Sequence, residues 1–297
     1  MNHKLIKITE VGPRDGLQNE TSVVPTDSKL KFIELLFKSG VTNLESTSFV
    51  RADKIPQLSD AKDLSEKIST TDIEKCIALV PNIKGYENAI KCRYQKIALF
   101  TAASETFCKK NINMSIRESI DMIQKVSRLA QIDKVSVRLY ISTVAHCPYE
   151  GYIHPSRVLE IIQFLEDIGA YEISLGDTIG LATPGNIDAL LGTLFTQYPP
   201  NLFAGHFHDT YGFAISNVQK SLEMGLRSFD SSAGGLGGCP YARGASGNLA
   251  TEDLLYFLKC SGYTTDINLE GILLASSYLE KILGKSLPSR TYRALSK

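Results

Sequence analysis

The sequence lacks the features that mark membrane, nucleic-acid-binding and disulfide-rich proteins. No apolar run approaches the roughly 18 residues of a membrane-spanning helix, and Lys+Arg and Asp+Glu balance at 32 each, which argues against nucleic acid or anionic membrane as a partner. The six cysteines show no C-x-x-C spacing, and a 297-residue chain with 43% hydrophobic residues does not need disulfides. The N-terminus shows neither a signal-peptide apolar region nor an Arg-rich leader, so we expect a cytoplasmic protein.

Short β-branched runs alternate with segments of helical periodicity along the whole chain. The predicted strands are 5–11, 43–46, 76–80, 96–100, 135–141, 171–175, 203–208 and 227–231. The clearest predicted helices are 27–39, 115–131, 155–169, 184–198 and 213–225. Eight strand–helix units of roughly 30 residues predict an α/β protein with the (β/α)8 TIM-barrel fold. A doubly wound open sheet is the alternative.

Two further helices, at about 251–259 and 268–283, follow the last strand. No linker and no low-complexity stretch interrupts the chain. We therefore predict a single catalytic domain over residues 1–297, a TIM barrel with additional C-terminal helices.

Active sites of TIM barrels lie at the carboxyl ends of the strands. Asp15 follows the first predicted strand, Glu45 ends the second, and Asp177 follows the sixth. His206 and His208 end the seventh. The polar residues that could perform chemistry thus fall where this architecture requires them.

The segment His206-Phe-His208 is the strongest indication of a metal site. Side chains two residues apart on a strand point to the same face, so both imidazoles can reach one ion while Phe207 packs outward. Asp15 could add a carboxylate, although an aspartate before Gly16 is also a common turn residue. On these residues alone, zinc or iron would suit the site as well as a harder cation.

Charged groups near the same strand ends have structural alternatives. Arg14 offers a planar fork for a carboxylate, a thioester oxygen or an enolate, but a surface ion pair would also explain it. Glu45 and Asp177 are candidate acid–base or polar-network groups, and Asp177 with Thr178 could instead cap a helix. Lys109 and Lys110, on a predicted loop, could meet phosphates, although we favour a solvated pair.

The glycine-rich segment 234–248 follows the eighth strand and is too irregular for a flexible linker. Glycine loses the most backbone entropy on folding, so such a loop indicates unusual φ values or close approach to a ligand. We interpret it as a ligand-covering loop that holds a reactive thiol, Cys239. Asn248 ends the loop and could act as a helix N-cap.

Several motifs resemble the 3-hydroxy-3-methylglutaryl-CoA lyases, over about residues 5–285. They are the segments 10–20 (EVGPRDGLQNE), 102–105 (AASE), 109–113 (KKNIN), 147–151 (CPYEG), 172–180 (EISLGDTIG), 206–212 (HFHDTYG) and 235–253 (GLGGCPYARGASGNLATED). The R-D-G-x-Q piece is shared with a wider group of metal-dependent barrels that includes isopropylmalate and homocitrate synthases. The cysteine loop is more specific to the lyases.

The resemblance implies cleavage of an acyl-CoA substrate, 3-hydroxy-3-methylglutaryl-CoA, to acetyl-CoA and acetoacetate with Mg²⁺ or Mn²⁺, in leucine degradation and ketone-body metabolism. It implies that the metal ligands are Asp15, His206, His208 and Asn248. Arg14 would stabilise the enolate of acetyl-CoA, and Cys239 would transfer a proton to it. Glu45, Asp177 and Glu252 would complete the polar shell. We also expect a homodimer.

Two rival functions remain at this stage. A condensing acyltransferase of the synthase type would use related chemistry to form a carbon–carbon bond, but those synthases usually carry an additional C-terminal region. Only about 50 residues follow the cysteine loop here, which favours the lyase. A ligand-sensing barrel without catalysis is the third possibility, and the presence of every expected catalytic residue type argues against it.

Overall fold

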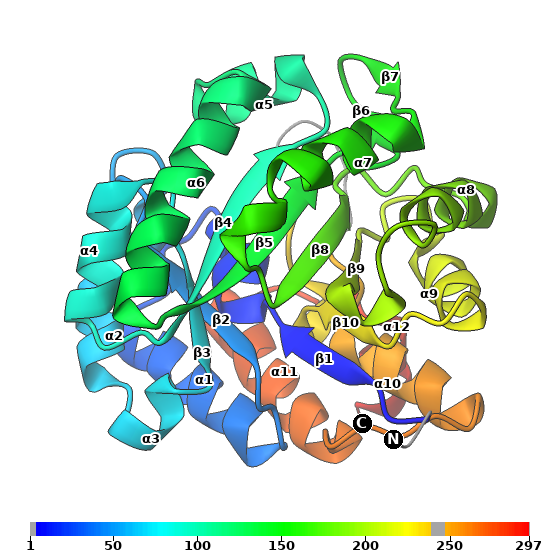
Figure 1. Cartoon of the computed structure of the whole chain (residues 1–297). Coiled ribbons are helices and arrows are strands. Elements are labelled where there is room, and N and C mark those ends of the chain that lie inside the picture. The colour runs from blue at the N-terminus through cyan, green and yellow to red at the C-terminus, as the bar shows by residue number, and fades with distance from the viewer. Residues whose placement is uncertain (1–3, 239–246, 297) are drawn as a thin grey trace.

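A computed structural model describes residues 4–238 and 247–296 and shows a closed barrel of eight parallel strands wrapped by helices (Figure 1). The barrel order is β1-β10-β9-β8-β5-β4-β3-β2, and every neighbouring pair is parallel. The strands are β1 (Lys7–Glu10), β2 (Leu44–Ser48), β3 (Cys76–Leu79), β4 (Lys96–Ala102), β5 (Ser136–Ser142), β8 (Glu172–Asp177), β9 (Phe203–Phe207) and β10 (Ser228–Ser231). The predicted fold class is confirmed, and the open-sheet alternative is wrong.

Helices surround the barrel and continue beyond its last strand. They are α1 (Thr26–Lys38), α2 (Ala61–Lys67), α3 (Thr70–Ile73), α4 (Ile83–Lys91), α5 (Glu105–Ile112), α6 (Ile116–Asp133), α7 (Pro155–Phe164), α8 (Pro184–Leu194), α9 (Ala214–Glu223), α10 (Thr251–Cys260), α11 (Leu269–Leu283) and α12 (Arg290–Leu295). Within the described ranges, no helix is long and apolar enough to cross a membrane.

Local sequence signals explain where several helices begin and end. Ser115 caps α6 in a capping box with Glu118, and Thr183 does the same for α8 with Asn186. Gly169 follows a 3₁₀ turn after α7 in the left-handed region, at φ +65°, which favours glycine. The predicted helix 155–169 therefore ends earlier, at Phe164, and its remainder is this turn.

Three short elements were not predicted from the sequence. An antiparallel hairpin of β6 (His146–Cys147) and β7 (Gly151–Tyr152) rises beside the barrel mouth, and α12 follows α11. α12 is tied to the rest of the chain at both Asp209, which accepts from Arg290 at 2.6 Å, and Asp253, which accepts from Ser289 at 3.0 Å.

The strands separate two different interiors. On β5, Val137, Leu139 and Ile141 join the large apolar core between strands and helices. The alternate residues Arg138 and Tyr140 point into the barrel, as the two-residue period of a strand requires. Part of the barrel interior is apolar, formed by Ile77, Leu79, Ala98 and Tyr140 with Phe100 packed against them.

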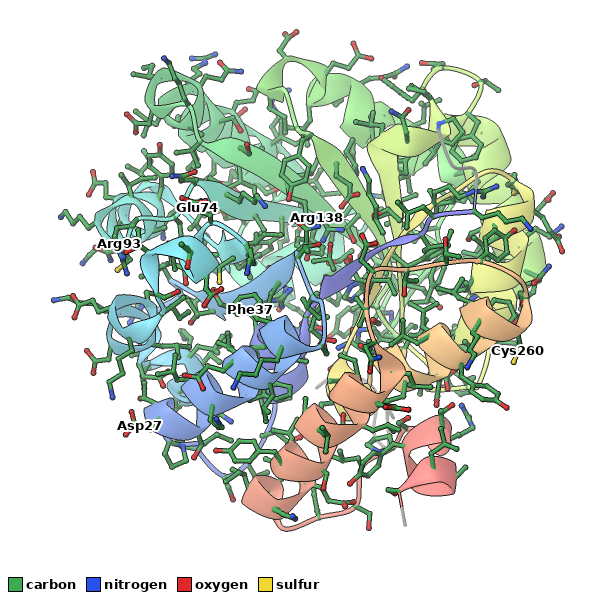
Figure 2. The ribbon with its side chains drawn as sticks, turned by 90° about the horizontal axis from the view of Figure 1, so that it is seen from below. Asp27, Phe37, Glu74, Arg93, Arg138 and Cys260 are labelled. Carbon is green, nitrogen blue, oxygen red and sulfur yellow. The ribbon has the colours of Figure 1, made fainter. Side chains whose placement is uncertain are left out.

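Another part of the barrel interior is charged, unlike the branched apolar layers usual in this fold. Arg138 is fully buried and donates to Glu172 at 2.7 Å and to both oxygens of Asp230, at 2.7 and 3.1 Å. Figure 2 shows Arg138 near the barrel centre when the molecule is seen from below, with Arg93 and Cys260 toward the periphery. Glu172 also lines a cavity of about 460 Å³ at the amino ends of the strands.

Replacing Arg138 by Met tests how much this buried charge pairing stabilises the barrel. The variant leaves Asp230 and Glu172 without their cation in a buried site, so we expect unfolding free energy to fall by about 3–5 kcal/mol. Urea unfolding followed by circular dichroism measures it. Arg51→Met, which breaks an exposed pair with Asp53, is the control and should change the midpoint little. Equal midpoints for the two variants would contradict the expectation.

Candidate metal centre and active site

The turn after β1 brings two charged residues to the barrel mouth. Residues Gly12–Gly16 form a single π-helical turn, with Pro13 in its first turn. A Cβ on Gly12 would lie 2.6 Å from the Glu10 carboxylate, and one on Gly16 would lie 2.6 Å from the Ser232 hydroxyl. A side chain at either end of the turn would therefore displace one of these groups, and the turn projects Arg14 and Asp15 between its two glycines.

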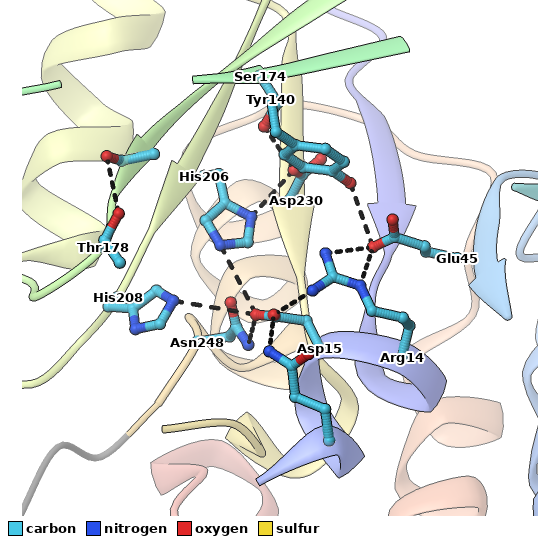
Figure 3. A network of polar contacts seen from close by, with 12 residues as sticks. Arg14, Asp15, Glu45, Tyr140, Ser174, Thr178, His206, His208, Asp230 and Asn248 are labelled. Atoms are coloured by element: carbon cyan, nitrogen blue, oxygen red, sulfur yellow. Dashed lines mark hydrogen bonds and ion pairs between the residues drawn. The ribbon is translucent and has the colours of Figure 1, made fainter. Parts of the chain in front are cut away.

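Asp15, His206 and His208 form the only group of three or more potential metal-ligating His, Cys, Asp or Glu side chains found among residues 4–238 and 247–296. One ligand atom from each lies within 4.8 Å of the others, and all three residues are buried. Asp15 Oδ2 lies 3.8 Å from His206 Nε2 and 4.0 Å from His208 Nε2 (Figure 3). The predicted convergence of these side chains is present.

The donor set fits a divalent cation. Two imidazoles and a carboxylate are common ligands for divalent metals, and all three residues are buried. Burial raises the pKa of the Asp15 carboxyl, but Arg14 and the two histidines outweigh it and lower the pKa to about 2. Asp15 is thus an ionised carboxylate at neutral pH, the form that binds metal.

Asn248 joins the same cluster. Its amide nitrogen donates to Asp15 Oδ2 at 2.8 Å and to the Leu236 carbonyl at 3.1 Å. An isolated antiparallel bridge pairs His208 with Asn248, which fixes the two backbones side by side. The alternative of an N-cap is wrong, because α10 is preceded by Ala250 and has no side-chain cap.

Arg14 is buried between two carboxylates. It contacts Asp15 Oδ1 at 2.5 Å and Glu45 Oε2 at 2.6–2.7 Å, and its guanidinium lies 5.7 Å from the Tyr140 ring centroid. Burial would lower the pKa of Arg14, but Asp15 and Glu45 raise it above its usual value, so the guanidinium stays charged. The alternative of a surface ion pair is wrong. Glu45 Oε1 is buried and has no hydrogen-bond partner within the described part of the chain.

Asp177 ends β8 next to the cluster and is fully buried. Its carboxylate accepts from the backbone N–H groups of Leu181 at 3.2 Å and Ala182 at 3.0 Å, so it also closes the turn after β8. Burial raises the pKa of Asp177 to about 6, although those hydrogen bonds and His206 lower it. Thr178 is not its capping partner; its hydroxyl accepts from the Thr143 N–H at 2.9 Å.

Glu252 lies on α10 and contacts the start of the glycine-rich loop rather than the cluster. Both of its oxygens accept from the Gly234 N–H at 3.0 Å, and Oε1 also accepts from the Ser276 hydroxyl. Gly234 has φ +73°, so Glu252 anchors a backbone position that favours glycine. Cys239 lies outside the described residues.

The ends of the glycine-rich loop lie against each other at the mouth. A Cβ on Gly247 would lie 2.7 Å from the Gly237 carbonyl carbon and oxygen, and one on Gly237 would lie 2.4 Å from Asn248 Nδ2. Gly237 and Gly247 also have φ values of +134° and +91°, which agrees with the expectation of unusual φ values in this loop.

Some site residues were not predicted from the sequence. Tyr140 donates to Glu45 Oε2 at 3.4 Å, Gln18 donates to Asp15 Oδ1 at 2.8 Å, and Asp230 accepts from His206 at 3.1 Å. The sequence signal that could have indicated such residues was Arg138. It is a charged residue in the centre of an otherwise apolar strand, which indicates a buried polar partner.

The lysine pair belongs to a helix rather than to the predicted loop. Lys109 lies on α5 and pairs with Glu105 at 3.3 Å, where both side chains are substantially exposed. Lys110 lies over the Tyr149 ring, 3.9 Å from its centroid. Both lysines have local partners.

The fold and this cluster define a class: TIM barrels that can hold a divalent cation at the carboxyl ends of their strands. Comparison with known proteins makes the assignment more specific. The HMGL-like family model matches residues 5–279, and the chain belongs to this family.

Three relatives are named for the same activity. The chain is 45% identical over 294 residues to mitochondrial hydroxymethylglutaryl-CoA lyases of Arabidopsis thaliana and Macaca fascicularis; the match spans 99% of this chain, 63% of the former and 90% of the latter. The hydroxymethylglutaryl-CoA lyase of Pseudomonas aeruginosa has a TM-score of 0.95 at 41% identity, covering 98% of this chain and 97% of that one. The predicted resemblance is confirmed.

A lyase from Acinetobacter baumannii, in complex with coenzyme A and 3-methylmalate, gives a TM-score of 0.94 at 34% identity, covering 99% of this chain and 96% of that chain.

The Glu252→Gln variant tests whether burial holds a proton on the Glu252 carboxyl in the folded protein. Burial raises the pKa of Glu252 to about 7, despite the bonds from Ser276 and Gly234 that lower it. The folded state keeps its proton between about pH 4.5 and 7 while the unfolded chain loses it, so Glu252 makes unfolding free energy fall as pH rises. One pKa unit corresponds to about 1.4 kcal/mol.

We expect the Gln variant to gain stability relative to wild type as pH rises through this window, in urea titrations at several pH values. Glu87→Gln, at an exposed helix position, serves as the control and should run parallel to wild type. A Glu252→Gln curve parallel to wild type would show that this carboxyl is not responsible.

Gly237→Ala tests whether the loop backbone holds Asn248 in place. The new methyl would lie on Asn248 Nδ2, at a φ of +134° that an L side chain rarely adopts, so we expect weaker Mn²⁺ binding in isothermal titration calorimetry. Gly238→Ala is the matched neighbour, because its Cβ would meet nothing closer than Asn19 Cβ at 3.9 Å among the described residues. Unchanged Mn²⁺ affinity in Gly237→Ala would contradict this account of Asn248.

Proposed function

We propose that this chain is a divalent-metal-dependent carbon–carbon lyase that cleaves 3-hydroxy-3-methylglutaryl-CoA to acetyl-CoA and acetoacetate, the reaction used in leucine degradation and ketone-body metabolism. The single observation that carries the proposal is the buried Asp15–His206–His208 cluster beside Arg14, in a chain that matches hydroxymethylglutaryl-CoA lyases along 99% of its length. The coenzyme A complex of a 34% identical lyase supports an acyl-CoA substrate.

We assign the metal ligands to Asp15, His206, His208 and Asn248, and the metal to Mg²⁺ or Mn²⁺. The carboxylate and amide among the donors support a hard cation. When bound, the cation supplies positive charge that stabilises negative oxygens of the substrate. The buried cluster also fits such a charge because Asp15 is ionised there.

The reaction requires a base, a group that stabilises the enolate, and an acid among the protein's own side chains. A base removes the proton of the tertiary hydroxyl, the bond between the carbinol carbon and the thioester α-carbon breaks, and its electron pair moves into the acetyl-CoA enolate. The carbinol carbon becomes the ketone of acetoacetate. An acid then protonates the α-carbon, so the atoms and charges balance.

Arg14 is suited to the enolate. It is a buried, permanently charged guanidinium whose position is set by Asp15 and Glu45 before substrate arrives. Preorganised charge in a site that excludes water stabilises developing negative charge more than it does in solution. Glu45 orients Arg14, and Tyr140 donates to the same Glu45 oxygen, Oε2.

Asp177 is our candidate base, supported by its place next to the cluster and by its raised pKa. Cys239 is our candidate acid, on the resemblance of its loop to that of the lyases. Glu252 is assigned to the same active site as a residue that holds the loop, because its carboxylate binds the Gly234 N–H.

The remaining assignments extend the sequence predictions. We propose a single catalytic domain, supported by a continuous apolar core and by the family match to residues 5–279. We propose a cytoplasmic homodimer that binds no nucleic acid; balanced charge supports the last point. Relatives at 44–45% identity include both mitochondrial and cytoplasmic lyases. Light scattering and localisation microscopy test the assembly and the compartment.

Activity of the purified protein tests the proposed reaction. With Mn²⁺ we expect it to release acetoacetate from 3-hydroxy-3-methylglutaryl-CoA, and a panel of longer branched 3-hydroxyglutaryl-CoAs defines the substrate range. Cys239→Ala should lower kcat by about 10²–10⁴-fold, the usual contribution of a proton-transfer group, with substrate binding nearly retained. Cys260→Ala, which removes an exposed thiol, should keep full activity.

No acetoacetate from the wild-type protein would refute the lyase assignment. A Cys239→Ala variant as active as Cys260→Ala would remove only the proton-transfer role.

A further inference from the structure

Asp230 lies in the middle of β10 inside the barrel and every oxygen of its carboxylate is used. Oδ2 accepts from the Ser174 hydroxyl at 2.7 Å, from Arg138 at 3.1 Å and from His206 Nδ1 at 3.1 Å. Oδ1 accepts from Arg138 at 2.7 Å. Figure 3 shows Asp230 behind the His206 ring, on the side away from Asp15. Asp230 is therefore committed to partners within the barrel.

This contact determines which nitrogen of His206 carries the proton. An ionised carboxylate only accepts hydrogen bonds, so His206 Nδ1 must be the donor. In the neutral ring, which is the form that binds metal, the lone pair is then on Nε2, the atom that lies 3.8 Å from Asp15 Oδ2 at the centre of the cluster. The ring is also held edge-to-face against Tyr140, with centroids 5.9 Å apart.

The two histidines of the cluster differ in this respect. His208 Nδ1 is buried and has no hydrogen-bond partner within residues 4–238 and 247–296. Among the described residues, His206 alone of the two has a carboxylate bonded to its Nδ1, that of Asp230. Asp230 is held by Arg138, whose Nε also donates to Glu172 at 2.7 Å. The support for His206 thus extends across the barrel.

We propose that Asp230 is a positioning residue for the metal centre: it holds His206 with Nδ1 protonated and Nε2 directed at the cation, while Arg138 and Ser174 hold Asp230. The proposal rests on the metal site proposed above. Hydrogen-bonded carboxylates behind metal-binding histidines fix the tautomer and the ring orientation, and their loss typically weakens metal binding by about 10–100-fold. Asp230 would contribute here without touching substrate or metal.

Asp230→Asn tests the proposal without relying on turnover. The neutral amide no longer forces a donor at His206 Nδ1, so we expect Mn²⁺ to bind about 10–100-fold more weakly by calorimetry. Asp60→Asn is the matched control, since it removes the carboxylate that pairs with the buried Lys29 at 2.8 Å, remote from the cluster by its contacts. Its Mn²⁺ affinity should equal that of wild type.

Nitrogen-15 NMR of metal-free protein with labelled histidine gives a second, independent measurement. The five histidines yield few signals, and loss of one in His206→Gln assigns His206. We expect wild-type His206 to be protonated at Nδ1 and the Asn variant to lose this preference. Wild-type His206 protonated at Nε2 alone, or wild-type Mn²⁺ affinity in a folded Asp230→Asn variant, would overturn the proposal.

The two measurements separate this proposal from the metal site on which it rests. Wild-type protein that binds no Mn²⁺ would refute the proposed metal centre, and the tautomer of His206 would still decide the role of Asp230. If Asp230→Asn does not fold, the wild-type spectrum decides the question.

Discussion

The pairing of Arg138 with Asp230 and Glu172 is the interaction on which the barrel interior depends. Charges that leave water lose solvation worth several kcal/mol each, and only close partners with good geometry compensate. Here one guanidinium meets two carboxylates at 2.7 Å, and serine hydroxyls occupy further oxygens of both, Ser174 on Asp230 and Ser228 on Glu172. A barrel usually filled by branched apolar side chains is therefore filled partly by salt bridges.

The same constraint connects the interior to the mouth. Asp230 joins Arg138 to His206, and Tyr140 joins Arg138 to Glu45, which in turn holds Arg14. The side chains proposed for metal binding and for enolate stabilisation are thus connected to the same buried residue, Arg138, through hydrogen bonds. Sites built in this way keep their geometry because the supporting shell fixes each rotamer.

Much of the architecture could be predicted from the sequence, because its signals are local. β-Branched runs and helix caps such as Thr183 act within a few residues of the chain. Asp15, His206 and His208 follow or end predicted strands, and a parallel barrel brings the carboxyl ends of its strands together, so their convergence was predictable as well. The hairpin at His146–Tyr152 and helix α12 escaped because two-residue strands and a six-residue helix carry too little periodicity.

The supporting residues were harder to predict for a different reason. In the sequence, Asp230 is one polar residue in a short strand. Its structural role depends on contact with Arg138, which lies 92 positions earlier. Glu252, taken as part of the polar shell, instead anchors Gly234, a contact that depends on how α10 packs behind the loop. Sequence spacing alone does not give contacts between elements that far apart.

The shared charges inside the barrel also restrict how such a protein can change over generations. Loss of Arg138 alone leaves Asp230 and Glu172 without their cation, and loss of either carboxylate alone removes hydrogen-bond acceptors from the fully buried Arg138, so each single step crosses a less stable intermediate. A route to an apolar interior requires coordinated replacement. In descendants of this chain the three positions should therefore persist or disappear as a group, and a lineage that loses them would also lose the support behind His206.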